Sequence, residues 1–104
     1  MKVERWNSNN DGPISERALR QKLEHLGYEV ASWTYPPGTP FMAHTPAVDK
    51  MDAVVSGEFR ITIGKEVVVL GSGDAVYVPK GVSHSAEVVG QSSVTSLDGV
   101  KLRD

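Results

Sequence analysis

The sequence has no cysteine among its 104 residues. Disulfides, thiolate metal ligands and cysteine nucleophiles are therefore excluded, and a domain of this size depends on side-chain packing, helped by a partner subunit or a metal where one is bound. No apolar stretch approaches the roughly 18 residues that a membrane-spanning helix needs. The first residues also lack the apolar core of a signal peptide. We therefore expect a cytoplasmic protein.

The sequence also lacks a large excess of charge of either sign. Eleven basic residues stand against 13 acidic residues, which gives a formal net charge of −2, and no block of like charge occurs along the chain. A protein that binds nucleic acid or an anionic membrane usually carries a basic patch. The sequence therefore predicts neither nucleic acid nor a membrane as a partner.

The length fits one domain, and we predict a single unit over residues 1–104. An N-terminal extension over residues 1–27 precedes a β-barrel over residues 28–100. Within the extension, residues 7–13 are all turn-forming types and predict a loop. The segment that follows predicts one short amphipathic helix over residues 16–26.

Local signals mark both ends of that helix. Ser15 can accept a hydrogen bond from the first turn, and Glu16 places negative charge at the positive end of the helix dipole. Gly27 supplies the left-handed conformation that ends many helices. His25, on the same helix, is expected to be a surface residue. Leucines recur at helical spacing and predict one apolar stripe: Leu19, Leu23 and Leu26.

From residue 28 onward the chain divides into short apolar segments separated by glycine and proline. Phe59, Ile61 and Ile63 alternate with polar residues, which is the period-2 pattern of a half-buried strand. Short strands at regular spacing are typical of an antiparallel sandwich or barrel. We expect strands over residues 28–35, 51–56, 58–63, 66–70, 75–78, 84–89 and 93–100.

Two glycine- and histidine-containing motifs lie among these strands. In the first, five residues separate Gly38 from His44, and Gly57 follows after the next expected strand. The second runs from Gly73 to His84 and reads Gly-Asp-Ala-Val-Tyr-Val-Pro-Lys-Gly-Val-Ser-His. A glycine turn, a strand, a proline turn and a histidine in this register rarely coincide by chance, so the second motif is the more specific of the two.

Through these motifs the chain resembles the cupin superfamily, over residues 30–98. The resemblance implies an all-β fold, the antiparallel double-stranded β-helix or jelly-roll barrel, here with one short N-terminal α-helix. Small cupins commonly dimerise, so a homodimer is expected. Subunit pairing would also cover the edge strands of an open sandwich.

The metal ligands of the family are only partly retained. In cupins that bind a metal, two histidines and a glutamate of the first motif join the histidine of the second around a divalent ion. The second histidine and the glutamate are replaced by Pro46 and Lys50. The resemblance implies a degenerate site that leaves two outcomes open: either His44 and His84 hold a divalent ion (Zn, Mn, Fe or Ni), or no metal is bound. Asp52 offers a third ligand if it turns towards the ion. Two imidazoles alone are an incomplete set, because stable zinc sites usually have at least three protein ligands.

Lys50 and Asp52 form the second part of the candidate site. Alternate residues of a strand share a face, and in the register of the family this face looks into the barrel, towards His44 and His84. A buried ammonium needs a counter-ion, and Asp52 is the nearest candidate. We expect the pair to replace the missing carboxylate ligand, and either to hold a substrate carboxylate or enol oxygen or to serve acid–base chemistry. The alternative is that one or both side chains face solvent at the rim.

Two functions remain open. The first is an enzyme acting on a small polar metabolite, an oxygenase, isomerase or lyase by family precedent, with His84, His44 and Lys50 as catalytic groups. The second is a non-catalytic or regulatory barrel that binds a small ligand and has lost its metal chemistry. In both, the ligand would contact His44, Lys50, Asp52 and His84. Four large side chains either line the ligand cavity or pack in the core or a dimer interface: Trp33, Tyr35, Phe41 and Met42.

Overall fold

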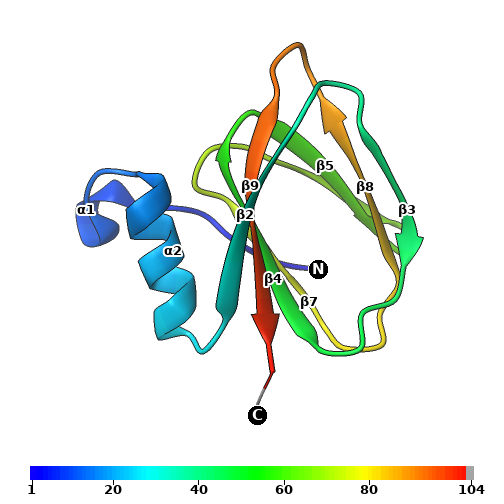
Figure 1. Cartoon of the computed structure of the whole chain (residues 1–104), viewed down its shortest axis with the longest axis horizontal. Coiled ribbons are helices and arrows are strands. Elements are labelled where there is room, and N and C mark those ends of the chain that lie inside the picture. The colour runs from blue at the N-terminus through cyan, green and yellow to red at the C-terminus, as the bar shows by residue number, and fades with distance from the viewer. Residues whose placement is uncertain (103–104) are drawn as a thin grey trace.

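The computed structural model describes residues 1–102, which fold into two facing antiparallel β-sheets with two helices on one side (Figure 1). The strands are β1 (Lys2–Glu4), β2 (Glu29–Tyr35), β3 (Pro40–His44), β4 (Asp49–Ser56), β5 (Glu58–Ile63), β6 (Glu66–Leu70), β7 (Ala75–Val78), β8 (His84–Val89) and β9 (Val94–Lys101). The helices are α1 (Ser8–Asp11) and α2 (Glu16–His25). One sheet has five strands in the order β1-β7-β4-β9-β2, and the other has four in the order β3-β8-β5-β6. This arrangement confirms the predicted all-β jelly-roll fold.

Every strand expected from the sequence is present, with its bounds shifted by two residues at most. Two further strands, β1 and β3, were not predicted. β1 has only three residues, too few for an alternating pattern. β3 begins at Pro40 and lies at an edge of its sheet, where proline is tolerated because its missing amide faces no partner strand.

The predicted loop over residues 7–13 contains one turn of helix, α1, so the N-terminal part has two helices and not one. The Asn7 side chain accepts a hydrogen bond from the Asn9 amide at 3.0 Å, and the Asp11 amide donates to the Asn7 carbonyl at 2.7 Å. Asparagine can form an open turn or cap a short helix with equal ease. The same residue types therefore gave no signal that distinguished the two.

Helix α2 covers the outer face of the five-stranded sheet (Figure 1). The Ser15 hydroxyl accepts a hydrogen bond from the first turn at 3.0 Å, which confirms the predicted cap. Leu19 and Leu23 are each 2% exposed, but Leu26 is 45% exposed, so its place in the buried stripe was wrong. The helix ends at His25, which is exposed as expected, and Leu26 follows as the C-cap. Within the described part of the chain, neither helix has enough apolar length to cross a lipid bilayer.

The main core lies between the two sheets and positions the polar side chains beside it. Eight buried residues form it: Val54, Phe59, Ile61, Leu70, Val76, Val78, Val88 and Val94. On β4, Asp52 is the cross-strand partner of Val76, and Lys50 that of Val78. Direct partners share a face of a sheet, so both charged residues continue the inner face on which the core is built.

A close approach of two backbones explains the glycine that closes the first motif. Gly57 joins β4 to β5 with a φ of +85°, a conformation that other residues rarely adopt. A Cβ atom there would lie 2.4 Å from the Ser93 carbonyl oxygen. The position therefore requires glycine for its backbone conformation and for its lack of a side chain.

Candidate functional site

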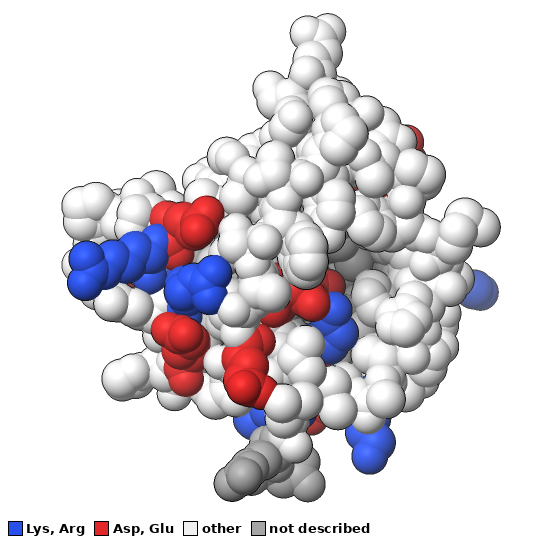
Figure 2. Space-filling view, viewed as in Figure 1, with Lys and Arg blue, Asp and Glu red and all other residues white. Residues whose placement is uncertain are grey.

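A pocket of about 290 Å³ opens between the two sheets, and Figure 2 shows the hollow near the centre of one face with acidic and basic atoms at its wall. Its apolar wall includes Trp33, Tyr35, Phe41, Met42, Phe59 and Ile61. Its polar end consists of His44, Lys50, Asp52, His84 and Asp98. The four residues expected to contact a ligand thus line one pocket. Its size is near the lower limit for small-molecule sites.

The two motif histidines meet across β3 and β8, where they are direct cross-strand partners. The ring centroids of His44 and His84 are 6.0 Å apart, and the ring planes are inclined by 69°. A bulge between Phe41 and His44 interrupts the alternation of β3. Residues three apart in a regular strand would face opposite sides, but because of the bulge the side chains of Phe41 and His44 both line the pocket. His84 has a side chain that is 11% exposed, whereas His44 is an exposed residue.

Lys50 and Asp52 face the pocket and form an ion pair, with 3.5 Å between Nζ and Oδ1. Their side chains are 17% and 13% exposed, so neither is directed into bulk solvent. The alternative in which one or both face solvent at the rim is therefore wrong. The pair arises because β4 is a central strand, held between β7 and β9, with its inner face towards the other sheet.

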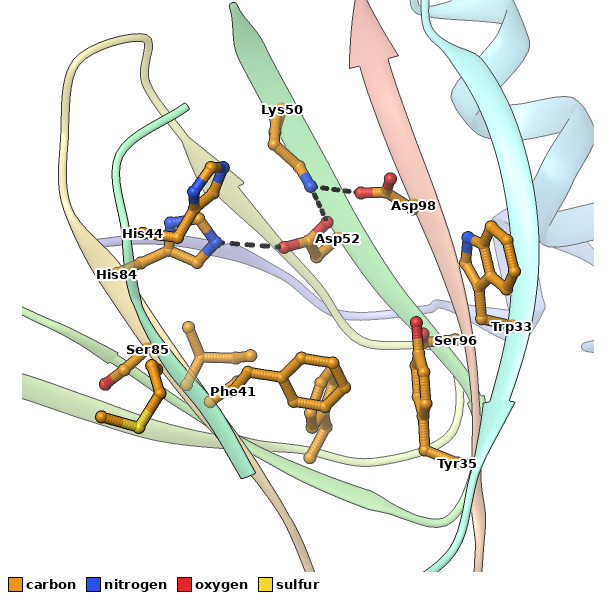
Figure 3. Close-up of a pocket in the computed structure, with 14 residues that line it drawn as sticks. Trp33, Tyr35, Phe41, His44, Lys50, Asp52, His84, Ser85, Ser96 and Asp98 are labelled. Atoms are coloured by element: carbon orange, nitrogen blue, oxygen red, sulfur yellow. Dashed lines mark hydrogen bonds and ion pairs between the residues drawn. The ribbon is translucent and has the colours of Figure 1, made fainter. Parts of the chain in front are cut away.

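Asp98 is a member of this cluster that the sequence did not reveal. It is the direct cross-strand partner of Asp52 on β9, and one carboxylate oxygen accepts a hydrogen bond from Lys50 Nζ. Figure 3 shows the Lys50 ammonium between the two carboxylates. The available signal was a lone acidic residue in the last apolar segment, but the pairing of β4 with β9 cannot be read from local pattern. We name Lys50, Asp52 and Asp98 the ion cluster.

Burial and charge shift the proton affinities of these groups. Burial raises the pKa of Asp52 to about 7, Asp98 adds to this effect, and Lys50 opposes it. Burial lowers the pKa of Lys50, but the charges of Asp52 and Asp98 outweigh it, so its pKa is raised overall. Lys50 therefore remains an ammonium at neutral pH, while Asp52 is close to the midpoint of its titration.

His84 lies within reach of the same carboxylate, with Nε2 at 4.0 Å from Asp52 Oδ2. Burial lowers the pKa of His84, the charge of Lys50 and the neighbouring His44 lower it further, and backbone groups of Val82 and His44 act in the opposite direction. The imidazole is therefore neutral at neutral pH. Its Nδ1 atom is buried and has no hydrogen-bond partner in the described part of the chain.

The residues at the polar end do not fit a divalent metal. Among residues 1–102, no three His, Cys, Asp or Glu side chains are grouped so that they could hold a metal ion. At the position of the glutamate ligand, Lys50 places an ammonium against Asp52, the third ligand that the sequence offered. A protonated lysine cannot donate to a metal and repels a cation beside it. The chemistry proposed below therefore involves no metal held by His44 and His84.

The four large side chains named from the sequence all line the pocket, but they divide into two roles. Tyr35 and Phe41 pack edge to face with ring centroids 4.8 Å apart, and both pack against the main core. Trp33 and Met42 are 53% and 84% exposed. The first two thus join the core to the pocket, and the other two present apolar surface where the pocket meets solvent.

Comparison with known proteins agrees with this geometry. The cupin family, described as a cupin domain, matches residues 31–99. An uncharacterised protein of Streptomyces coelicolor is 36% identical over 75 residues, which are 72% of this chain and 67% of that protein.

Two solved structures share the fold at low identity. A predicted oxalate decarboxylase of Thermotoga maritima has a TM-score of 0.66 at 22% identity, covering 80% of this chain and 74% of that chain. The cupin domain of an XRE family transcriptional regulator of Enterobacter cloacae has a TM-score of 0.64 at 21% identity, covering 78% of this chain and 87% of that chain. Likenesses at this identity concern the fold alone. The family match over most of the chain, together with the jelly-roll architecture and the paired histidines, shows that the chain belongs to the cupin family.

Proposed function

We propose that this cupin domain binds a small polar molecule between its sheets and moves a proton on it, as an isomerase or lyase does. One observation carries the proposal: Asp52, whose pKa is raised to about 7 by burial, lies in a pocket beside the neutral imidazole of His84. A general acid or base works best when its pKa is near the working pH. Strongly shifted groups inside a pocket are also typical of functional sites.

In this proposal each side chain has a role. The Asp52 carboxylate accepts a proton from a C–H bond beside a carbonyl group of the bound molecule, and the electron pair of that bond moves onto the carbonyl oxygen. Lys50, which contacts Asp52, supplies positive charge that stabilises the developing oxyanion. Asp52, now protonated, returns that proton to a second atom in an isomerisation, or to the leaving group in an elimination, while the neutral His84 imidazole beside it donates a hydrogen bond to the ligand. His44, at the exposed end, contacts the ligand.

Proton exchange tests this chemistry without knowledge of the natural substrate. The protein is incubated in deuterated buffer with a panel of small ketones, aldehydes, 2-oxo acids and amino ketones, and ¹H NMR follows the loss of the C–H signal beside the carbonyl. We expect the wild-type chain to catalyse exchange on a subset of the panel. Asp52→Asn should slow that exchange by about a hundredfold or more, the usual contribution of a general base.

The control is Glu87→Gln, which removes a carboxylate from an exposed ion pair with Arg60. It should leave exchange unchanged. Equal rates for the wild-type chain and Asp52→Asn would show that Asp52 is not the base. Exchange that needs neither Asp52 nor His84 would remove the proposed chemistry altogether.

A second candidate function is ligand binding without turnover, as in a regulatory domain. The observation that favours it is the loss of two family ligands, at Pro46 and Lys50, from a barrel that otherwise keeps its pocket. The solved cupin domain of the Enterobacter cloacae transcriptional regulator offers a precedent in fold. Saturable binding of panel members, with neither deuterium exchange nor conversion of the bound compound into a product, would favour this candidate over the enzyme.

A further inference from the structure

We infer that the ligand of this pocket is a small organic cation, a protonated amine or guanidinium attached to an aromatic or apolar body. This inference rests on the proposed function, because it names the ligand class of the same pocket. It follows from three features of the polar end: the balance of charge in the ion cluster, the exposure of Asp98, and the indole ring beside it.

The ion cluster has two acidic groups and a single permanent positive charge. Two carboxylates, Asp52 and Asp98, stand directly opposite each other across β4 and β9, and one ammonium, Lys50, contacts both. Like charges directly opposite in a sheet repel each other. In the described part of the chain, the other basic group within 4.0 Å of either carboxylate is His84, a neutral imidazole at neutral pH. When Asp52 is ionised, one negative charge is therefore left for a ligand to balance, and when Asp52 is protonated the ion cluster is neutral.

Asp98 presents that charge to an incoming molecule. Its side chain is 34% exposed, against 17% for Lys50 and 13% for Asp52. The Lys50 side chain is thus less exposed than the Asp98 side chain that accepts its hydrogen bond. A ligand anion would have to approach Lys50 against two carboxylates, whereas a ligand cation meets an accessible carboxylate first.

An aromatic surface lies next to this carboxylate. Trp33 on β2 is the cross-strand partner of Ser96 on β9, and Ala31 is that of Asp98. Trp33 and Asp98 therefore share the inner face of the sheet, and Figure 3 shows Asp98 between Lys50 and Trp33. Cations are attracted to the face of an indole ring. Because Trp33 is 53% exposed, its ring is free to contact a ligand.

The apolar wall accounts for the rest of the ligand. Beyond Asp98 and Trp33, the pocket continues along Tyr35, Phe41 and Ile61. A cationic group at Asp98 would place an attached apolar body against this wall. A carboxylate, an indole face and an apolar wall in one pocket of about 290 Å³ are the chemistry that recognises a small amphiphilic amine.

Three probes of matched shape test the inference: benzylamine, benzyl alcohol and benzoate, which carry a positive, no and a negative charge at neutral pH. Binding to the intact chain is measured by titration calorimetry and by ligand-observed NMR. We expect benzylamine to bind at least about tenfold more tightly than either of the others, from one charge-assisted hydrogen bond and one cation–aromatic contact.

Two variants locate the preference. Asp98→Asn should remove the advantage of benzylamine over benzyl alcohol, and the chain should remain folded because the amide keeps the shape of the side chain. Glu87→Gln, on the opposite sheet and paired with Arg60, removes the same charge from the molecule and should leave the advantage intact. An equal loss in both variants would reduce the effect to net charge and overturn the inference.

The outcomes separate the ligand class from the proposed function. Tighter binding of benzoate or benzyl alcohol would overturn the cation inference, while the pocket as a ligand site would stand. Binding of benzylamine that Asp98→Asn does not weaken would also overturn it. If a folded chain binds none of the three probes, both the inference and the proposed ligand pocket fail. Absent exchange in deuterated buffer with retained selectivity for benzylamine would contradict the chemistry alone.

Discussion

Asp52→Asn is expected to stabilise the folded chain at neutral pH while it disables the proposed site. Burial raises the pKa of Asp52 from its ordinary 3.8 to about 7, with Lys50 opposing this change and Asp98 adding to it. One pKa unit corresponds to about 1.36 kcal/mol. Keeping Asp52 ionised in the folded chain therefore costs about 4 kcal/mol relative to the unfolded chain. Asparagine has nearly the same shape and carries no charge, so the variant avoids this cost.

The sign of the effect follows from the direction of the pKa shift. Because the pKa of Asp52 is higher in the folded chain than in the unfolded chain, this carboxyl contributes stability that is fully present below its unfolded pKa and is lost as the pH rises through about 7. The variant has no such dependence. The difference in free energy of unfolding should be small near pH 4, should widen by about 1.4 kcal/mol per pH unit, and should level off above pH 7 at about 4 kcal/mol in favour of the variant.

Urea denaturation followed by tryptophan fluorescence measures this difference across the pH range. The groups outside the ion cluster titrate in the same way in both proteins, so their contributions cancel when the two curves are subtracted. Glu87→Gln serves as the control, because its exposed pair with Arg60 should give a small difference that hardly varies with pH. Parallel stability curves for Asp52→Asn and the wild-type chain, or a variant that is less stable above pH 7, would refute the assignment of a strongly raised pKa.

The remaining predictions address the cluster, the family register, the turn and the assembly. Lys50→Met should move the pKa of Asp52 above 7, since Lys50 lowers it. Carboxyl-detected NMR measures this pKa, and a lower or unchanged value would contradict the role of Lys50. Lys50→Glu should create affinity for Zn²⁺, because a carboxylate would join the two imidazoles; calorimetry without a binding signal would contradict the register that equates Lys50 with the glutamate of the family. Gly57→Ala should lower the free energy of unfolding by more than about 1 kcal/mol, and more than Gly64→Ala, where nothing lies within 4 Å of the added Cβ; equal melting temperatures would count against the close approach at residue 57. The chain should sediment as a homodimer, because the edge strands β1, β2, β3 and β6 invite pairing; a chain that sediments as a monomer at high concentration would contradict this prediction.

The sequence was sufficient for the parts of the site that depend on one strand or one motif. Lys50 and Asp52 are two residues apart on β4, so strand alternation alone placed them on one face. His44 and His84 were assigned to the pocket by the register of the two motifs, and the bulge in β3 keeps His44 in that register. Such relations are local, and a residue pattern carries them.

The parts that the sequence did not reveal depend on contacts between distant segments. Asp98 belongs to the cluster because β9 pairs with β4 in a register that puts it opposite Asp52. No local pattern records that pairing, and an acidic residue in an apolar strand suggests a solvent-facing position equally well. For Trp33 and Met42, pattern alone could not separate core from cavity, and only their exposure at the pocket decided the matter.

Asp98 changes the net charge around Lys50, the lysine at the position of the family's glutamate ligand. In the ligand set that the family resemblance implies, a divalent ion with one glutamate leaves a net positive charge at the pocket, which suits an anionic ligand. In this chain a single ammonium, Lys50, contacts two acidic groups, and the net charge of the cluster becomes negative when Asp52 is ionised. Had Lys50 been joined by Asp52 alone, the pair would have been neutral and would have favoured neither sign of ligand. We therefore propose that the second carboxylate, that of Asp98, reverses the electrostatic preference of the barrel while the jelly-roll fold stays unchanged.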